Sequence, residues 1–184
     1  TLDGIASLAA DPKVVGIGET GLDFFRDWAP KENQYALFRN TIAFAKEQRK
    51  PLVIHCRDAA EETIAVLKEC NAESVGGVFH CYAQDAEFAK RLADINFIVS
   101  FTGNITFKKA DALRDAVRQI PLTQMMLETD MPYMAPEPFR GKPSEPRHVQ
   151  SVAYRVADIK GLTIEEVAKT TTETANKFFG LGVA

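Results

Sequence analysis

Four side chains of the kinds that bind divalent metals stand at the ends of short apolar runs in this sequence. Glu19 follows VVGIG, His55 follows PLVI, His80 follows GGVF, and Asp130 lies in MMLETD. Carboxylates and imidazoles are common ligands of divalent cations, and the strand ends of a parallel β-barrel all open at one mouth. The repeated placement therefore predicts a metal site at the mouth of such a barrel.

Alternation along a strand sends neighbouring side chains to opposite faces. In the pairs His55-Cys56 and His80-Cys81 only one residue can face the barrel axis, so the cysteines point out if the histidines point in. Each ligand alone has a plainer interpretation, because a lone histidine is more often a hydrogen-bonded structural residue and a lone carboxylate is usually a cap or a turn residue. Four of them at one topological level favour the metal site.

The composition is that of an ordinary globular protein, with 184 residues, 46% hydrophobic and 26% charged. This length predicts one domain, yet it is short for a complete eight-stranded barrel. Three cysteines, no N-terminal signal sequence and no long apolar stretch predict a reducing, cytoplasmic setting without disulfides or a membrane association. The net charge of −3 excludes a global basic field for nucleic acid, so phosphate binding would depend on local Lys and Arg.

Helical and strand patterns alternate along the chain, and this order predicts a parallel sheet covered by helices. The expected strands are 14–18, 52–54, 76–80, 97–101 and 124–128. The expected helices are 2–10, 31–49, 59–70, 84–94, 109–118, 147–160 and 163–178, with a Pro-rich loop at 132–146. The α/β class with a TIM-type (β/α)8 architecture is the predicted fold.

Six runs of residues resemble one family closely and in the right order over nearly the whole chain. They are GIGETGLDFF, LVIHCRDA, VFHCYAQD, SFTGNITFKKA, LETDMPYMAPEPFRGKPSEP and TTTETANKFFGL. In these runs the sequence is similar to the TatD family of metal-dependent deoxyribonucleases. The resemblance implies an amidohydrolase-type barrel that cleaves DNA phosphodiester bonds, often from the 3′ end, and some members are associated with removal of D-amino acids from tRNA.

The resemblance also implies roles for the four ligands. Glu19 would be shared between two divalent metals, His55 and His80 would hold the outer one, and Asp130 would hold the inner one and take the proton of the attacking water. Glu19 and Asp130 are thus the implied catalytic residues. The resemblance does not distinguish Mg, Mn and Zn.

The sequence departs from the family pattern in one respect. Members begin with a strand that carries an His-x-His pair, and this chain has no such pair. With strand starts about 28 residues apart, three missing βα units would need roughly 80 more residues. The expectation is therefore a C-terminal portion of the barrel with about five strands. It would hold one weak metal, show little activity, and associate into homo-oligomers through exposed strand edges.

Several residues in loops after the predicted strands are candidates for contacting a DNA substrate, and a solvated charged loop is their plainer alternative. Arg57 suits a phosphate, although an ion pair with Glu128 or Asp58 is an equal alternative. The remaining candidates are Lys108, Arg140, Tyr82 and Tyr133, with Lys142 and Arg147 beside them.

Four other residues have structural interpretations as well as functional ones. Asp23 either supports the metal ligands or merely forms a turn. Phe25 and Trp28 could stack a base, but packing beneath their loop is the favoured interpretation. His148, at a predicted helix start, is interpreted as a surface residue.

Two functional hypotheses from different classes follow. The first is a metal-dependent phosphodiesterase of the TatD type, with a related hydrolase such as a D-aminoacyl-tRNA deacylase as its neighbour. The second is a catalytically impaired remnant that acts by oligomerising or by binding a partner. The missing His-x-His strand separates them, because a natural sequence that contains it would favour the first.

Overall fold

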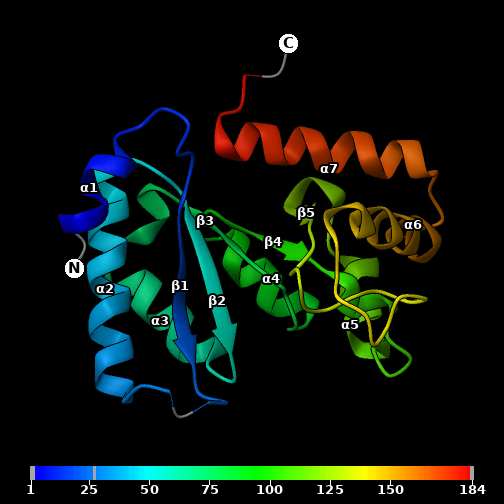
Figure 1. The fold of residues 1–184 in the computed structure, drawn as a ribbon, viewed down its shortest axis with the longest axis horizontal. Coiled ribbons are helices and arrows are strands. Elements are labelled where there is room, and N and C mark those ends of the chain that lie inside the picture. Colours follow the sequence, from blue (N-terminus) through cyan, green and yellow to red (C-terminus); the bar gives the residue numbers. More distant parts are fainter. Residues whose placement is uncertain (1–2, 27, 183–184) are drawn as a thin grey trace.

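A single parallel sheet organises the protein, shown by a computed structural model that describes residues 3–26 and 28–182 (Figure 1). The strands of these residues are β1 (Ile17–Asp23), β2 (Leu52–Arg57), β3 (Gly77–Phe79), β4 (Phe97–Phe101) and β5 (Met125–Leu127). They lie side by side in the order β1-β2-β3-β4-β5, and every neighbouring pair is parallel. This sequential parallel order is the order of strands around a (β/α)8 barrel, so the predicted sheet is confirmed.

Helices connect the strands as the alternating pattern predicted. They are α1 (Asp3–Ala9), α2 (Lys31–Gln48), α3 (Ala60–Glu69), α4 (Ala86–Ala93), α5 (Asp111–Gln119), α6 (Val149–Lys160) and α7 (Ile164–Phe179). Short 3-10 turns are η1 (Ala72–Ser74), η2 (Gly103–Thr106), η3 (Leu122–Gln124) and η4 (Pro146–His148). None of the helices in this part of the chain combines the length and apolar character needed to span a bilayer.

The helices bury the apolar stripes that the sequence predicted. Phe38, Ile42 and Ala45 of α2 are fully buried, at helical spacing. The start of α7 carries the predicted capping box, in which Thr163 and Glu166 accept each other's backbone N–H groups. Such caps satisfy N–H groups that have no partner within the helix, which explains why this helix start could be predicted within one residue.

The boundaries of two strands differ from the prediction, and the difference matters for the site. The first strand was expected at residues 14–18, but β1 is Ile17–Asp23, and β2 continues to Arg57 instead of ending at residue 54. The pairing continues past the apolar residues, with Thr20 opposite Ile54 and Asp23 opposite Arg57. A strand is defined by its hydrogen-bonded ladder, and polar residues can continue that ladder. Glu19 and His55 therefore lie inside strands and not after them.

The two outer strands of the sheet, β1 and β5, are not paired with each other in the described residues. Helix α7 packs against β5, and its Phe179 ring lies 3.3 Å from the position that a Cβ on Gly16 would occupy. The helix thus reaches from the last strand of the sheet to the residue just before the first one (Figure 1).

Candidate metal centre

The four predicted ligands come from within β1 and β2 and from the segments that follow β3 and β5. Glu19 and His55 come from neighbouring strands β1 and β2. His80 directly follows β3, and Asp130 lies in the segment that follows β5. Because parallel strands end at a common edge, residues separated by up to 111 positions meet there through their side chains.

Glu19 and His55 are in direct contact. Glu19 Oε1 lies 2.8 Å from His55 Nδ1, and the other ring nitrogen, Nε2, lies 3.0 Å from Asp23 Oδ2. The β1–β2 register shifts between Ile17 and Thr20, and such an irregularity re-aims a side chain by breaking the alternation of faces. Glu19 is accordingly exposed whereas Thr20 is buried.

The orientation of the His55-Cys56 pair agrees with the alternation argument. The Cys56 side chain packs against the buried core. Burial raises the pKa of the Cys56 thiol. His55 meets carboxylates on the opposite face, so in this pair the histidine is the residue available to a ligand site.

His80 is held by a carboxylate that the sequence analysis considered only as an ion-pair partner of Arg57. Glu128 Oε2 lies 2.7 Å from His80 Nδ1, and Glu128 Oε1 accepts a hydrogen bond of 2.9 Å from the backbone N–H of Cys81. The remaining ring nitrogen, His80 Nε2, lies 3.9 Å from Glu19 Oε1 and 3.8 Å from Asp130 Oδ1. One nitrogen is thus anchored and the other faces two carboxylates.

The pKa values of the first pair favour an ion pair in the metal-free arrangement. The hydrogen bond from His55 lowers the pKa of Glu19, although partial burial opposes the change. The same bond raises the pKa of His55 against the effect of burial, and Asp23 raises it further. Both nitrogens of His55 face carboxylate oxygens, so its charged form donates two hydrogen bonds.

The pKa values around His80 separate the carboxylates into two kinds. Burial disfavours the charged form of His80, but Glu128 and the neighbouring charges outweigh it and raise the pKa of His80. Burial also opposes ionisation of Glu128, yet the contact with His80 lowers the pKa of Glu128 overall. Burial raises the pKa of Asp130, helped by the charges of Glu19 and Glu128. Of these three carboxylates, Asp130 is the one whose pKa is raised and not lowered.

The geometry around His80 Nε2 can be tested against the size of a metal ion. Within residues 3–26 and 28–182, no group of three or more His, Cys, Asp or Glu side chains is placed closely enough to hold a metal ion as the side chains stand. Two ligands about 2.1 Å from one cation at a tetrahedral angle lie about 3.4 Å apart. The separations of 3.9 Å to Glu19 and 3.8 Å to Asp130 exceed this by about half an ångström. The side chains as they stand therefore do not form a metal site, but a movement of about half an ångström would bring Glu19 and Asp130 within reach of a divalent cation bound to His80 Nε2.

The hydrogen bond from His80 to Glu128 supports the same conclusion. A histidine that binds a metal through one nitrogen usually donates the N–H of its other nitrogen to a carboxylate, which fixes the tautomer. Glu128 occupies that position for His80 Nδ1 and leaves Nε2 facing Glu19 and Asp130. In the metal-free arrangement His55 is committed to Glu19 and Asp23, so it can join the ligands only after losing a proton.

Four of the predicted substrate residues are exposed. Arg57 has no ion pair with Glu128 or Asp58 in the described part of the chain, and its guanidinium carbon lies 3.7 Å from the centroid of the Phe25 ring. Lys108 is exposed, Tyr133 is 70% exposed, and the Arg140 guanidinium lies 3.8 Å from the centroid of Phe107. Their contact with substrate stays a prediction. Lys142 is exposed as well, whereas Arg147 forms an ion pair with Glu145.

The expectations for two other residues need correction. Tyr82 was expected to touch substrate, but it is 2% exposed, and its hydroxyl donates a 2.6 Å hydrogen bond to the carbonyl of Asp85. His148 was interpreted as a surface residue, but it is buried. Its Nδ1 accepts a hydrogen bond from the Glu145 N–H, and its ring stacks on Phe139. The Tyr82 hydroxyl and His148 Nδ1 thus find local backbone partners, whereas the buried His148 Nε2 has no hydrogen-bond partner among the described residues.

The expectation for Phe25 and Trp28 was also wrong. Packing beneath their loop was favoured over exposure, yet Phe25 is 57% exposed and Trp28 is 81% exposed. The alternatives for Asp23 turn out not to exclude each other, because one oxygen contacts His55 and the other forms the turn.

Two functional residues escaped the sequence analysis. Glu128 stands two positions before Asp130 in the LETD run, and two carboxylates at this spacing at a strand end would have been the signal for it. Gln34 lies in the first turn of α2, where its side chain bonds the backbone of Asp23 and Ala29. No pattern in the sequence marks a glutamine for that contact.

Comparisons with known proteins add a family assignment to this geometry. A family described as TatD related DNase matches residues 1–180. A Bacillus subtilis protein named "Uncharacterized metal-dependent hydrolase YabD" is 47% identical over 175 residues, which cover 95% of this chain and 69% of the relative. The "3'-5' ssDNA/RNA exonuclease TatD" of a Rahnella strain is 36% identical, covering 97% of this chain and 70% of the relative.

A solved structure confirms the fold. The crystal structure of the TatD homologue YjjV from Escherichia coli superposes with a TM-score of 0.91 at 26% identity, covering 98% of this chain and 70% of that one. The chain thus spans about two thirds of the length of the relatives that it matches, 69% and 70% for the two named above. The predicted α/β class of the TIM-barrel type is confirmed.

Proposed function

The chain belongs to the TatD family of metal-dependent hydrolases, and on that premise we propose that it hydrolyses phosphodiester bonds of nucleic acid, with DNA as substrate and the 3′ end as the starting point. The observation that carries the proposal is the arrangement of Glu19, His80 and Asp130 around one small space, with His80 oriented by Glu128. The polarity and the single-stranded substrate in the name of the Rahnella relative support the finer part of the proposal.

We propose that Glu19, His80 and Asp130 hold a divalent cation, and that His55 joins them once it has released its proton. A bound divalent cation supplies Lewis-acid polarisation of the phosphoryl oxygen and lowers the pKa of a coordinated water. Glu128 fixes the tautomer of His80 so that Nε2 remains an acceptor. The native metal is not distinguished among Mg, Mn and Zn by these oxygen and nitrogen donors.

Asp130 is the proposed proton acceptor in the reaction. Its pKa is raised by burial, whereas the pKa values of Glu19 and Glu128 are lowered by their histidine partners. A general base works best when its pKa approaches the working pH. Asp130 therefore takes the proton of the attacking water, while the exposed guanidinium of Arg57 receives a phosphate oxygen of the substrate.

The free thiols of the protein bear on its proposed cellular location. Cys56, Cys70 and Cys81 are all free, and burial raises the pKa of Cys81 to about 11. Free thiols persist in reducing compartments, which supports a cytoplasmic location as part of the proposal. Homo-oligomers through the unpaired outer edge of β1 remain part of the proposal as well.

The test is cleavage of a 5′-labelled single-stranded oligonucleotide by the chain in enzyme excess, with Mg, Mn or Zn added. We expect a ladder that shortens from the 3′ end, loss of cleavage with a chelator, and loss of most cleavage in Glu19→Ala and His80→Ala. The control Glu73→Gln removes an exposed charge from η1, which precedes β3 and so lies at the opposite end of that strand from His80, and it should cleave at the normal rate. Metal binding without cleavage of DNA or RNA would overturn the proposal and favour the alternative of a catalytically impaired chain.

A further inference from the structure

Two aromatic rings stand in solvent beside the proposed metal centre without a structural task. Trp28 is 81% exposed and Phe25 is 57% exposed, both in the loop between β1 and α2. A single exposed apolar side chain is ordinary, but two large exposed rings within four residues of one loop form a local apolar surface, and such surfaces can mark a binding site. We call Phe25, Arg26 and Trp28 the aromatic loop.

The aromatic loop is tied directly to the proposed metal site by one carboxylate. Asp23 Oδ1 accepts hydrogen bonds from the backbone N–H groups of Phe25 at 2.9 Å and Arg26 at 3.2 Å. The other oxygen, Asp23 Oδ2, lies 3.0 Å from His55 Nε2. The start of the loop is therefore fixed relative to His55 through a single side chain.

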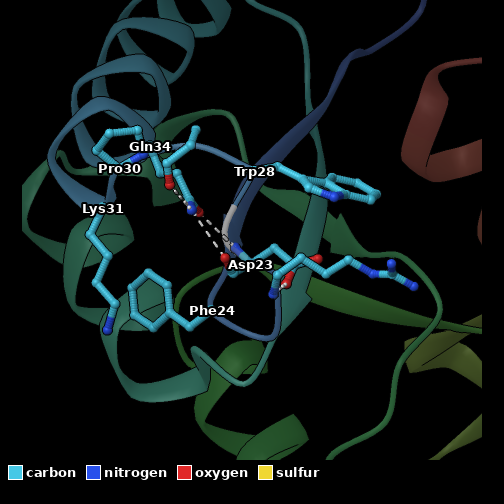
Figure 2. Close-up of a pocket in the computed structure, with 8 residues that line it drawn as sticks. Asp23, Phe24, Trp28, Pro30, Lys31 and Gln34 are labelled. Carbon is cyan, nitrogen blue, oxygen red and sulfur yellow. Dashed lines mark hydrogen bonds between the residues drawn. The ribbon is translucent and has the colours of Figure 1, made fainter.

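Gln34 fixes the loop from the side of α2. Its Oε1 accepts a hydrogen bond of 2.9 Å from the Asp23 N–H, and its Nε2 donates bonds of 3.0 Å to the carbonyls of Asp23 and Ala29. Figure 2 shows Gln34 reaching Asp23, with Trp28 on one side of that contact and Phe24 and Lys31 on the other. The loop is anchored near both of its ends, so its aromatic rings are presented on a supported backbone.

Cations accompany the exposed rings. The Arg57 guanidinium lies 3.7 Å from the Phe25 centroid, and that of Arg26 lies 5.1 Å from the Trp28 centroid. Asp23, Phe24, Arg26, Trp28 and Lys31 also border a hollow of about 300 Å³. Aromatic rings that stack bases, next to cations that meet phosphates, are the combination by which proteins hold single-stranded nucleic acid.

We propose that Phe25 and Trp28 form a base-stacking platform that receives an unpaired base of the strand whose phosphate enters the metal centre. The inference rests on the proposed function and deepens it, because it names the part of the nucleic acid that is recognised and the residues that recognise it. Bases inside a duplex are stacked on both faces, and a terminal base that stays paired cannot turn out of the helix onto the loop, so the platform selects unpaired ends. Phe25 and Trp28 are specificity-determining residues, and Gln34 is a positioning residue.

Trp28 makes the inference directly measurable, since it is the only tryptophan of the chain. The chain, with a chelator present so that no cleavage occurs, is titrated with oligothymidylate and with an abasic oligonucleotide of the same length and charge. We expect the bases of oligothymidylate to quench Trp28 fluorescence, and the abasic strand and a blunt duplex to leave it nearly unchanged. Phe25→Ala should weaken binding of oligothymidylate roughly 5- to 150-fold, the range found for base–aromatic stacking.

Tyr154 provides the matched control, because it is an aromatic residue of α6 that is 62% exposed and lies outside the loop. Tyr154→Ala should leave the quenching curve and the affinity unchanged. Since Phe25 and Tyr154 are both exposed, neither substitution removes buried packing, and the two variants should unfold at the same temperature as the parent.

The outcomes separate this inference from the proposed function. Equal quenching by the abasic strand, equal quenching by the duplex, or unchanged affinity in Phe25→Ala would each overturn the platform. Cleavage of DNA without any response of Trp28 would also overturn the platform and leave the hydrolase standing. Quenching by oligothymidylate alone, in a chain that cleaves no phosphodiester, would support the platform and remove the hydrolase.

Discussion

Glu128→Gln should weaken metal binding although Glu128 itself touches no metal. In the parent, the Glu128 carboxylate can only accept, so the 2.7 Å contact requires the proton of His80 on Nδ1. A glutamine at this position can present its NH₂ group to Nδ1 instead, which moves the His80 proton to Nε2. An Nε2 that carries a proton has no lone pair for a cation, so the donor facing Glu19 and Asp130 is lost.

The size of the effect follows from the contacts that are exchanged. Loss of the outer partner of a metal-binding histidine typically reduces metal affinity by about 10- to 100-fold, equivalent to about 1.4 to 2.7 kcal/mol. That range agrees with the net free energy of a hydrogen bond to a charged group, which is about 1.5 to 3 kcal/mol. The glutamine carbonyl can still accept the 2.9 Å hydrogen bond from the Cys81 N–H, so the fold should be retained.

The assay is competition for Zn or Mn against a chromophoric chelator, with circular dichroism to verify the fold. Glu137→Gln in the Pro-rich loop serves as the control for removing one negative charge, since Glu137 makes its contact to Thr106 through the backbone N–H. An affinity of Glu128→Gln equal to that of the parent and the control would show that Glu128 does not orient His80. The assignment of Nε2 as the metal-facing atom would then be wrong.

Three further outcomes are expected. Metal titration by calorimetry should give one weakly held cation for each chain, and two tight equivalents would contradict the ligand assignment. Hydrogen bonds from Thr163 hold the pKa of Glu166 below its usual value. The ionised Glu166 therefore stabilises the fold above the usual pKa of a glutamate, and this stabilisation is lost as pH falls through the lowered pKa. The difference in unfolding temperature between Glu166→Gln and the parent should disappear over the same pH range. Gly21→Ala should cost about 2 kcal/mol in unfolding free energy, because φ is +148° and the new Cβ would overlap the His55 carbonyl oxygen. Gly4→Ala in α1 meets nothing within 4 Å and, as a glycine replaced in a helix, should stabilise slightly, by up to about 1 kcal/mol, in the same denaturant melts.

The order of helices and strands could be predicted from the sequence because each element carries its own local pattern. The buried stripe of α2 repeats at helical spacing, and the capping box at Thr163 and Glu166 uses residues only three positions apart. The end of β1 had no such pattern. Its residues Glu19 to Asp23 are polar or glycine, and they are in a strand only because β2 provides the pairing partner.

The same division between local and distant causes applies to the candidate site. The positions of Glu19, His55, His80 and Asp130 could be proposed from where apolar runs stop, since the ends of parallel strands share an edge. The contacts that determine the chemistry of these side chains could not be predicted from the sequence. Glu128 reaches His80 across 48 residues of sequence, and the exposure of Trp28 depends on what the fold leaves uncovered.

The Asp23 side chain connects the candidate metal site to the aromatic loop, because it contacts both. Its carboxylate divides its two oxygens between His55 and the backbone of the loop, so a movement of His55 toward a cation changes the anchor of Phe25 and Arg26. Gln34 resists that movement because it holds the Asp23 backbone on both its N–H and its carbonyl. Under the two proposals, a base stacked on the loop and a cation bound near His55 would act on the same carboxylate, and any change that one made in the affinity of the other would be equal in both directions.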